Sequence, residues 1–143
     1  MNIKIESYSQ GPKEFNPEVL KKNSSLALRL TFSPRLRYSQ NDDIVGFQLD
    51  INAEIDKVNV LRFGFLLAMT AEGFSESVKE LNGNLSADLS IIYPLCDTLM
   101  LVATGAVASF TATQEIPGII LPEIKVEEFA KIVTLQPLIS NNK

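Results

Sequence analysis

The chain has 143 residues, of which 45% are hydrophobic and 21% are charged, as is usual for a globular protein and unusual for a disordered one. This length predicts a single domain, residues 1–143, that can bury a core without disulfides. The net charge of −4 excludes nucleic acid as an expected partner, because a negative field repels phosphate backbones. With no histidine and one cysteine, neither a zinc site nor an internal disulfide is expected.

Neither a secretion signal nor a membrane span is expected. The first 25 residues alternate apolar and polar side chains and lack the apolar run of a signal. The longest uncharged stretch, Thr98 to Gln114, contains several threonines and falls short of the roughly 20 apolar residues that a span needs. We therefore expect a cytoplasmic protein that does not insert into membranes.

Four strands are predicted in the first half of the chain. Residues 2–10 and 24–32 alternate apolar and polar side chains, and Pro34 then marks a bulge, an edge or a break. Residues 45–55 have one apolar and one polar face, whereas residues 58–71 are apolar on both faces and need cover on both. Tight turns between these segments favour an antiparallel meander.

A long helix is predicted after Gly73, where the pattern changes. Residues 75–81 are expected to form a short helical turn, with Ser86 as the cap of the long helix. Apolar residues then recur at three- and four-residue spacing from Leu89 to Phe110, and Pro94 is expected to divide or kink this helix.

The second half of this helix has no charge on any side. A helix that is apolar all round is buried all round, and small residues at four-residue spacing let another helix approach closely. We therefore expect a homo-oligomer with helix-to-helix contacts. The predicted interface residues are Leu101, Gly105, Ala108, Ser109 and Ala112.

An apolar connector, residues 116–122, and a second amphipathic helix from about Lys125 complete the chain. The predicted fold class is therefore α+β. It comprises a four-stranded antiparallel meander sheet followed by a long helix and a short C-terminal helix.

No residue pattern indicates catalysis, so the chain is not expected to be an enzyme and no catalytic, metal or cofactor site is assigned. Nucleotide-binding glycine motifs are absent. Asp50 and Glu54 share a strand face but are separated by roughly 13 Å of strand. Asp42 and Asp43 fit a turn, and Cys96 lies at a core-facing helical position, where a cysteine acts as a small hydrophobe.

The order of elements and several short motifs resemble the SecB export chaperone family. Ile91-Ile92-Tyr93-Pro94 is similar to the aromatic-Pro start of that family's long helix. Residues 116–124 resemble its Phe-Pro-x-Leu-x-Leu-x-Pro-Val loop, and residues 15–19 resemble the aromatic-x-Pro-Glu-Val stretch before its second strand. Glu127 and Phe129 match acidic and apolar positions of its closing helix. The resemblance covers nearly the whole chain.

The resemblance implies a dimer of dimers with the long helices packed between sheets, binding unfolded polypeptides without ATP. The chain departs from the family pattern at Pro122, which stands one place early, and at Val126, which replaces an aromatic residue. Arg62-Phe63-Gly64 stands where the family carries an acidic contact for the SecA motor, and the acidic tail is missing. SecA is therefore not an expected partner.

The favoured hypothesis is an ATP-independent holdase for non-native polypeptides, with protein export as one candidate role. Two alternatives are a carrier of an apolar small molecule and an oligomeric interaction protein that has the fold without chaperone activity. A third, an enzyme using the carboxylates named above, would need the fold to bring two of them together. The predicted peptide-binding residues are Phe63, Phe65, Leu67, Ile119, Ile120 and Leu121.

Overall fold

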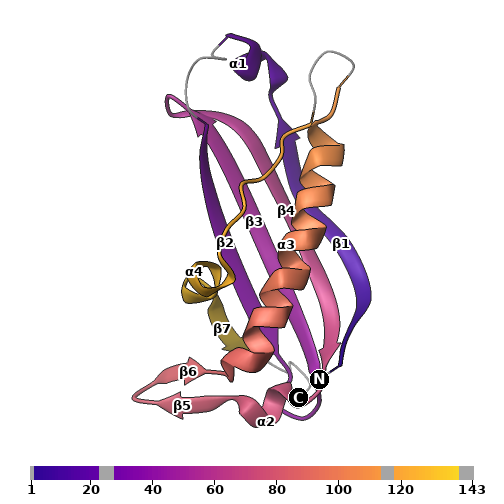
Figure 1. Ribbon diagram of the computed structural model, residues 1–143, viewed down its shortest axis with the longest axis vertical. Coiled ribbons are helices and arrows are strands. Elements are labelled where there is room, and N and C mark those ends of the chain that lie inside the picture. The colour runs from indigo at the N-terminus through magenta and orange to yellow at the C-terminus, as the bar shows by residue number, and fades with distance from the viewer. Residues whose placement is uncertain (1, 23–27, 114–117, 139–143) are drawn as a thin grey trace, which may run out of the picture.

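The computed structural model describes residues 2–22, 28–113 and 118–138, and shows one sheet with a long helix lying across one face (Figure 1). The sheet has five strands in the order β1-β4-β3-β2-β7. They are β1 (Ile3–Phe15), β2 (Arg29–Tyr38), β3 (Ile44–Ile55), β4 (Val58–Ala71) and β7 (Thr134–Pro137). The long helix is α3 (Leu89–Thr111), and the short helices are α1 (Pro17–Lys22), α2 (Phe74–Ser77) and α4 (Val126–Lys131).

The predicted α+β class is confirmed, while the strand order differs in detail from a simple meander. Strands β2, β3 and β4 form antiparallel hairpins as predicted, but β1 pairs with β4 on the far side of the hairpins. The segment after β1, which includes α1, carries the chain past the end of the sheet, so β2 begins at the opposite edge. Periodicity identifies strands and says nothing about which strands pair, so this crossing could not be predicted.

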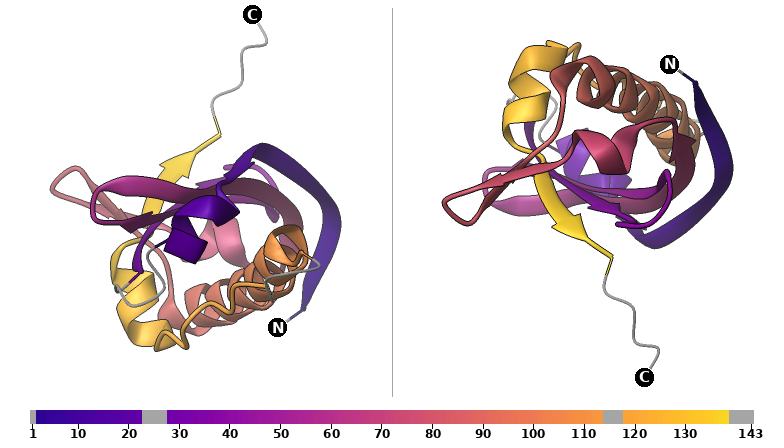
Figure 2. Two further views of the ribbon diagram at one scale, coloured as in Figure 1. Left: turned by 90° about the horizontal axis from the view of Figure 1, so that it is seen from above. Right: turned by 90° about the horizontal axis from the view of Figure 1, so that it is seen from below.

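The core lies between the sheet and α3. The inward side chains of β3 and β4 are almost completely buried, and α3 contributes one face of its helix to the same cluster. In Figure 2, α3 and the connector between α3 and α4 both lie on this face of the sheet, and β1 arcs around the side of α3. The largest fully buried side chains include Phe47, Phe63, Phe65, Phe74 and Phe129.

The other face of the sheet is polar and has no helix over it among the described residues. All four arginines of the chain, Arg29, Arg35, Arg37 and Arg62, are exposed on β2 and β4. The expectation that β4 needs cover on both faces is wrong for this structure, since Leu66 on the outer face is 40% exposed. No described element covers the outer face of β4, and some of its residues are small or have polar neighbours. At Gly64, for example, the Asp50 carboxylate occupies the space that a Cβ would need.

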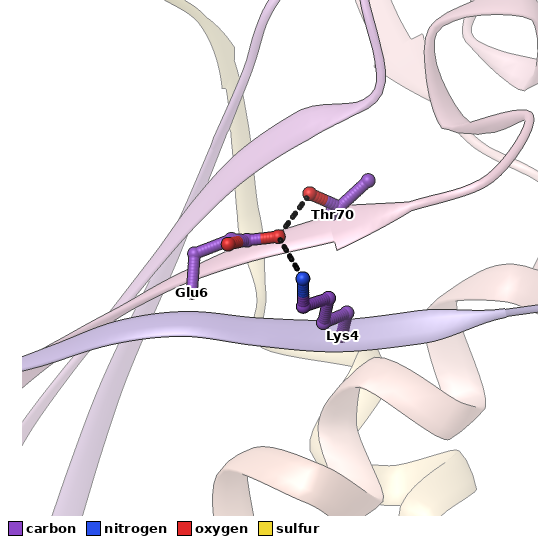
Figure 3. Close-up of polar contacts among 3 residues, drawn as sticks. All are labelled: Lys4, Glu6 and Thr70. Atoms are coloured by element: carbon purple, nitrogen blue, oxygen red, sulfur yellow. Dashed lines mark hydrogen bonds and ion pairs between the residues drawn. The ribbon is translucent and has the colours of Figure 1, made fainter.

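A polar cluster connects β1 with β4 at the end of the pair where β1 begins and β4 ends (Figure 3). Glu6 stands where the register between β1 and β4 shifts. Its carboxylate accepts a hydrogen bond from the Thr70 hydroxyl (3.0 Å) and lies 3.8 Å from the Lys4 ammonium. Both charged groups are well exposed, so the ion pair adds little to stability and mainly orients the bulge.

The long helix begins at Asp88 and not at the predicted cap, Ser86. The Asp88 carboxylate accepts a hydrogen bond from the Ser90 N–H (3.0 Å), as an N-cap does. That hydrogen bond lowers the pKa of Asp88. Ser86 instead ends strand β6. The helix runs through Pro94 without a break, so the predicted division there is wrong.

Residues 74–86 form a helical turn followed by a hairpin, and not only the predicted turn. Strand β5 (Lys79–Leu81) pairs with β6 (Asn84–Ser86) around Asn82-Gly83, both of which have positive φ. An Asn-Gly pair is the strongest short-range hairpin signal, so the sequence does indicate a hairpin at this position. The hairpin projects away from the main sheet (Figure 1).

After α4, the chain adds a strand that was not predicted. β7 pairs in parallel with β2, with Thr134 opposite Arg35 and Pro137 opposite Tyr38. The aromatic ring of Phe129 on α4 packs edge-on against Phe32 of β2, with centroids 6.4 Å apart. Residues 24–27 of the predicted second strand and Ile116-Pro117 of the loop motif lie outside the described residues.

Candidate functional site

The connector is fixed against the C-terminal end of α3 by two close contacts. Thr111 is completely buried, and its hydroxyl donates to the Val107 carbonyl (2.7 Å) and accepts from the Ile119 N–H (2.6 Å). Gly118 lies so close to the Ala108 carbonyl that a Cβ at this position would collide with it. From this anchor the connector runs back along α3 toward α4 (Figure 1).

An open groove of about 550 Å³ lies between α3 and the connector, and we call it the connector groove. This volume falls within the range of ordinary ligand sites. Apolar side chains dominate the groove, but the exposed carboxylates of Asp97 and Glu123 also line it, one from each wall. The apolar lining comprises Met100, Leu101, Leu121, Pro122 and Ile124.

The architecture that builds this groove has a counterpart among solved structures. A SecB-like chaperone of Mycobacterium tuberculosis, Rv1957, solved in complex with a ChAD peptide from the HigA1 antitoxin Rv1956, superposes with a TM-score of 0.52. The match covers 86% of this chain and 88% of that chain at 12% sequence identity. The chain has a SecB-like fold.

The likeness is one of fold, since no family model and no curated protein sequence matches the chain. A protein of unknown function from Streptococcus agalactiae also matches, over 86% of this chain and 94% of that chain, with 14% identity and a TM-score of 0.33.

Within this SecB-like fold, the six predicted peptide-binding residues fall into two groups. Phe63, Phe65 and Leu67 are at most 2% exposed and form part of the core between the sheet and α3. They therefore line no open surface with their side chains in this conformation. The connector residues differ: Ile120 is 80% exposed, Ile119 is half-buried, and Leu121 is buried at the base of the connector groove.

The predicted interface residues lie together on the outer side of α3. Leu101 is 76% exposed, and Gly105, Ser109 and Ala112 are exposed as well, while Ala108 is half-buried. A Cβ added at Gly105 would meet no atom within 4 Å. The uncharged helix is thus buried on its inner face and open on its outer face in the single chain.

Sequence reasoning assigned a role to Leu121 and Leu101 and missed the six other lining residues of the connector groove, namely Asp97, Met100, Thr104, Pro122, Glu123 and Ile124. A signal was present for the three on the helix. Asp97, Met100, Leu101 and Thr104 follow one another at helical spacing and share one face of α3. Glu123 lies in a segment without regular secondary structure, where no periodicity predicts which way a side chain points.

Two of the carboxylates considered for catalysis, those of Asp50 and Asp42, make structural contacts. Asp50 lies 3.9 Å from Arg35 and accepts a hydrogen bond from Gln48 (3.2 Å), and Asp42 accepts from the Ile44 N–H (3.1 Å) in a turn. Burial, with a smaller contribution from the neighbouring Asp97, raises the pKa of the Cys96 thiol to about 12. Cys96 therefore stays protonated and unreactive.

The hydrophobic character of α3 extends over its whole length. By length and composition alone this helix could cross a membrane, with a mean hydropathy of 1.7 over its most apolar 18 residues, of which 33% are buried. Its inner face, however, belongs to the same core as the sheet, including Leu95, Leu99 and Val107.

Proposed function

We propose that this protein is an ATP-independent chaperone that holds unfolded polypeptides in the connector groove. The observation that carries the proposal is an open, largely apolar groove between the long helix and the connector of a SecB-like fold. A segment of unfolded chain with two or three apolar side chains would bury them against Met100 and Ile124, at about 25 cal/mol per Å² of apolar surface removed from water.

The neighbouring sheet edge offers backbone contacts that would extend such binding. β7 pairs with β2 only from Arg35 to Tyr38. On this side of β2, no described strand lies beside Arg29–Pro34, whose other side pairs with β3. Leu30 and Phe32, in this stretch, are half-buried on the α4 side of the sheet. An extended client could therefore continue the line of β7 and hydrogen-bond to the free edge, independently of its sequence.

Charge should decide which clients bind most tightly. Among the residues that the structure describes, Asp97 and Glu123 are the only charged ones that line the groove, and they belong to a chain of net charge −4. Cationic side chains beside an apolar core would be attracted to the groove and acidic ones repelled, more strongly at low salt. A peptide with lysine flanks should compete better than the same peptide with glutamate flanks.

Suppression of aggregation of a chemically unfolded client, without nucleotide, tests the proposal. We expect the protein to suppress light scattering, and Ile124→Ser, which removes an apolar side chain from the groove wall, to weaken the effect several-fold. Leu81→Ser is the matched control, because Leu81 is 73% exposed but lies on the β5–β6 hairpin, away from the groove. No suppression at a stoichiometric ratio, or equal losses in both variants, would contradict the proposal.

The outer side of α3 supports a second element of the proposal, an assembly of four copies as a dimer of dimers. The outer face of α3 exposes leucine, alanine and glycine and carries no charge beyond Asp97. Exposure of such an apolar face to water is unfavourable, and a second helix of the same kind would bury it. Light-scattering mass measures this directly. A tetramer that falls to a smaller species in Leu101→Glu is the expected result, and a wild-type monomer would contradict it.

A further inference from the structure

A second groove lies on the opposite side of α3, between the helix and β1, and we call it the β1 groove. Its volume is about 460 Å³. The helix wall is largely apolar, with Val102, Ala106 and Phe110, whereas the strand wall consists of Tyr8, Gln10 and Lys13. This pairing of a polar wall with an apolar wall distinguishes the β1 groove from the connector groove.

The polar wall occupies positions that face the core side of the sheet. Tyr8, Gln10 and Lys13 stand directly opposite three core residues of β4: Leu67, Phe65 and Phe63. They are joined by hydrogen bonds. The Lys13 ammonium donates to the Gln10 side-chain oxygen (2.7 Å), and the Gln10 amide donates to the Tyr8 hydroxyl (3.1 Å). Long polar side chains are thus held in line along the groove.

Aromatic rings form a continuous row beside this polar wall. Tyr8, Phe65, Phe63, Phe110 and Phe15 follow one another with centroid distances of 5.7, 6.2, 5.4 and 6.3 Å. The two end regions of the row differ in polarity: a phenol stands at one end, and the Lys13 ammonium lies 5.4 Å from the centre of the Phe110 ring near the other. Phe63 and Phe65 lie in the core, so a molecule in the groove would contact the row only at Tyr8 and Phe110, the two rings that line it.

The Lys13 ammonium has capacity for a further partner. It is the only charged group lining the groove, and no carboxylate of residues 2–22, 28–113 or 118–138 forms an ion pair with it. An ammonium has three donors, and one is used on Gln10. An inward lysine can also protect a sheet edge from pairing, but Pro12 and two register shifts already do so in β1.

We propose that the β1 groove binds an amphiphilic carboxylate. The apolar body, acyl or aromatic, would lie between the rings of Tyr8 and Phe110 and the aliphatic side chains of Val102 and Ala106. The carboxylate would accept a hydrogen bond from the Lys13 ammonium. The site takes the anionic end because Lys13 is the single charged residue that lines it in the described part of the chain. This inference does not rest on the chaperone function, which uses the other side of α3.

Fluorescence titration with dansyl-undecanoic acid, below its micelle concentration, tests the proposal. We expect saturable binding that Lys13→Gln weakens about five- to tenfold, as is typical for a hydrogen bond to a charged group at a partly exposed site. Lys4→Gln is the matched control, because Lys4 is on the same strand and pairs with Glu6 outside the groove. Ala106→Leu, which fills the groove, should abolish binding while the melting temperature is retained.

Competition with ligands of different charge makes the test specific for the anionic end. Laurate should displace the probe, and dodecylamine should displace it poorly. Equal displacement by both amphiphiles, or equal losses in Lys13→Gln and Lys4→Gln, would overturn the proposal. Binding that survives Ala106→Leu but is lost in Ile124→Ser would place the probe in the connector groove and overturn it as well.

Discussion

The two flanks of α3 differ in both charge and construction. On the connector flank, irregular backbone is fixed against the helix end by Thr111 and Gly118, and the resulting groove carries the carboxylates of Asp97 and Glu123. On the β1 flank, a curved edge strand stands off from the helix, and the groove carries the ammonium of Lys13. One helix, whose single charged residue is Asp97, therefore separates two grooves of opposite charge.

This difference shows how a single apolar helix can serve surfaces of different chemistry. The helix contributes similar aliphatic walls to both grooves, through Met100 and Leu101 on one side and Val102 and Ala106 on the other. Selectivity comes from the segments that face it. On the connector flank the backbone packs tightly against the helix, whereas on the β1 flank side chains separate strand and helix. The same substitution should therefore change the stability of the protein differently on the two flanks.

The largest expected effect is a difference in stability between two glycine-to-alanine variants, one on each flank. Gly118→Ala should destabilise the protein by about 3 kcal/mol, because the new Cβ collides with the Ala108 backbone carbonyl, which cannot rotate away. Gly11→Ala in β1 should change stability by less than about 0.5 kcal/mol, since its Cβ would lie 3.5 Å from the Gly64 oxygen, an ordinary contact. Urea unfolding measures both. Similar values for the two variants would show that the flanks do not differ in tightness.

The threonine anchor gives a somewhat smaller effect. Thr111→Val keeps the shape but leaves the part-buried Ile119 N–H without its acceptor, which should cost about 1–2 kcal/mol. Thr104→Val is the control, because the Thr104 hydroxyl is exposed and bonds only to the Met100 carbonyl of its own helix. Hydrogen exchange at the Ile119 amide should accelerate in the first variant alone. Unchanged exchange would mean that Gly118 by itself holds the connector.

Gly105 lies on the outer face of α3 between the two flanks. Whether Gly105→Ala raises or lowers stability distinguishes a single chain from an assembly. In a single chain Gly105→Ala should stabilise α3 by about 1 kcal/mol, because alanine has the higher helix propensity and the new Cβ meets no atom within 4 Å. If a second copy packs closely against this face, the same methyl group should instead weaken the assembly. Thermal unfolding at several protein concentrations distinguishes the two results, since only the assembly has a concentration-dependent midpoint.

The sequence predicted most helices and strands well, but it did not predict which strands pair or how the grooves form. Strict alternation located β3 and β4, but it predicted the second strand at residues 24–32, whereas β2 runs from Arg29 through Pro34 to Tyr38. Apolar residues at helical spacing from Leu89 to Phe110 located α3. Pairing of β1 with β4 and of β7 with β2 depends on contacts between distant segments, which no local pattern records. The same limit applies to the grooves: Ile120 was named from its hydrophobicity, but the facing positions of Lys13 and Phe110 depend on how β1 curves around the helix.

Phe63 and Phe65 show most clearly what hydrophobicity alone leaves open. Their alternation placed them on one face of a strand, and a residue on such a face can line a groove or fill a core. The structure buries both side chains between the sheet and α3, where they join the aromatic row beside the β1 groove. Which outcome applies depends on whether a helix lies over that face, and this in turn depends on strand order.

The smallest expected effect concerns the N-terminal end of α3, where both flanks begin. The hydrogen bond from the Ser90 N–H lowers the pKa of Asp88, so the cap favours the folded state when the carboxylate is ionised. This contribution is complete above the unfolded pKa of about 4 and is lost as pH falls through the lower folded pKa. Asp88→Asn keeps an acceptor but does not titrate, so the stability difference from wild type should shrink as the solution is acidified below about pH 4. Urea midpoints of the two proteins across this range test the sign. A difference that grows on acidification would mean that the carboxylate does not act as the cap, and that α3 and both of its flanks are held by core packing alone.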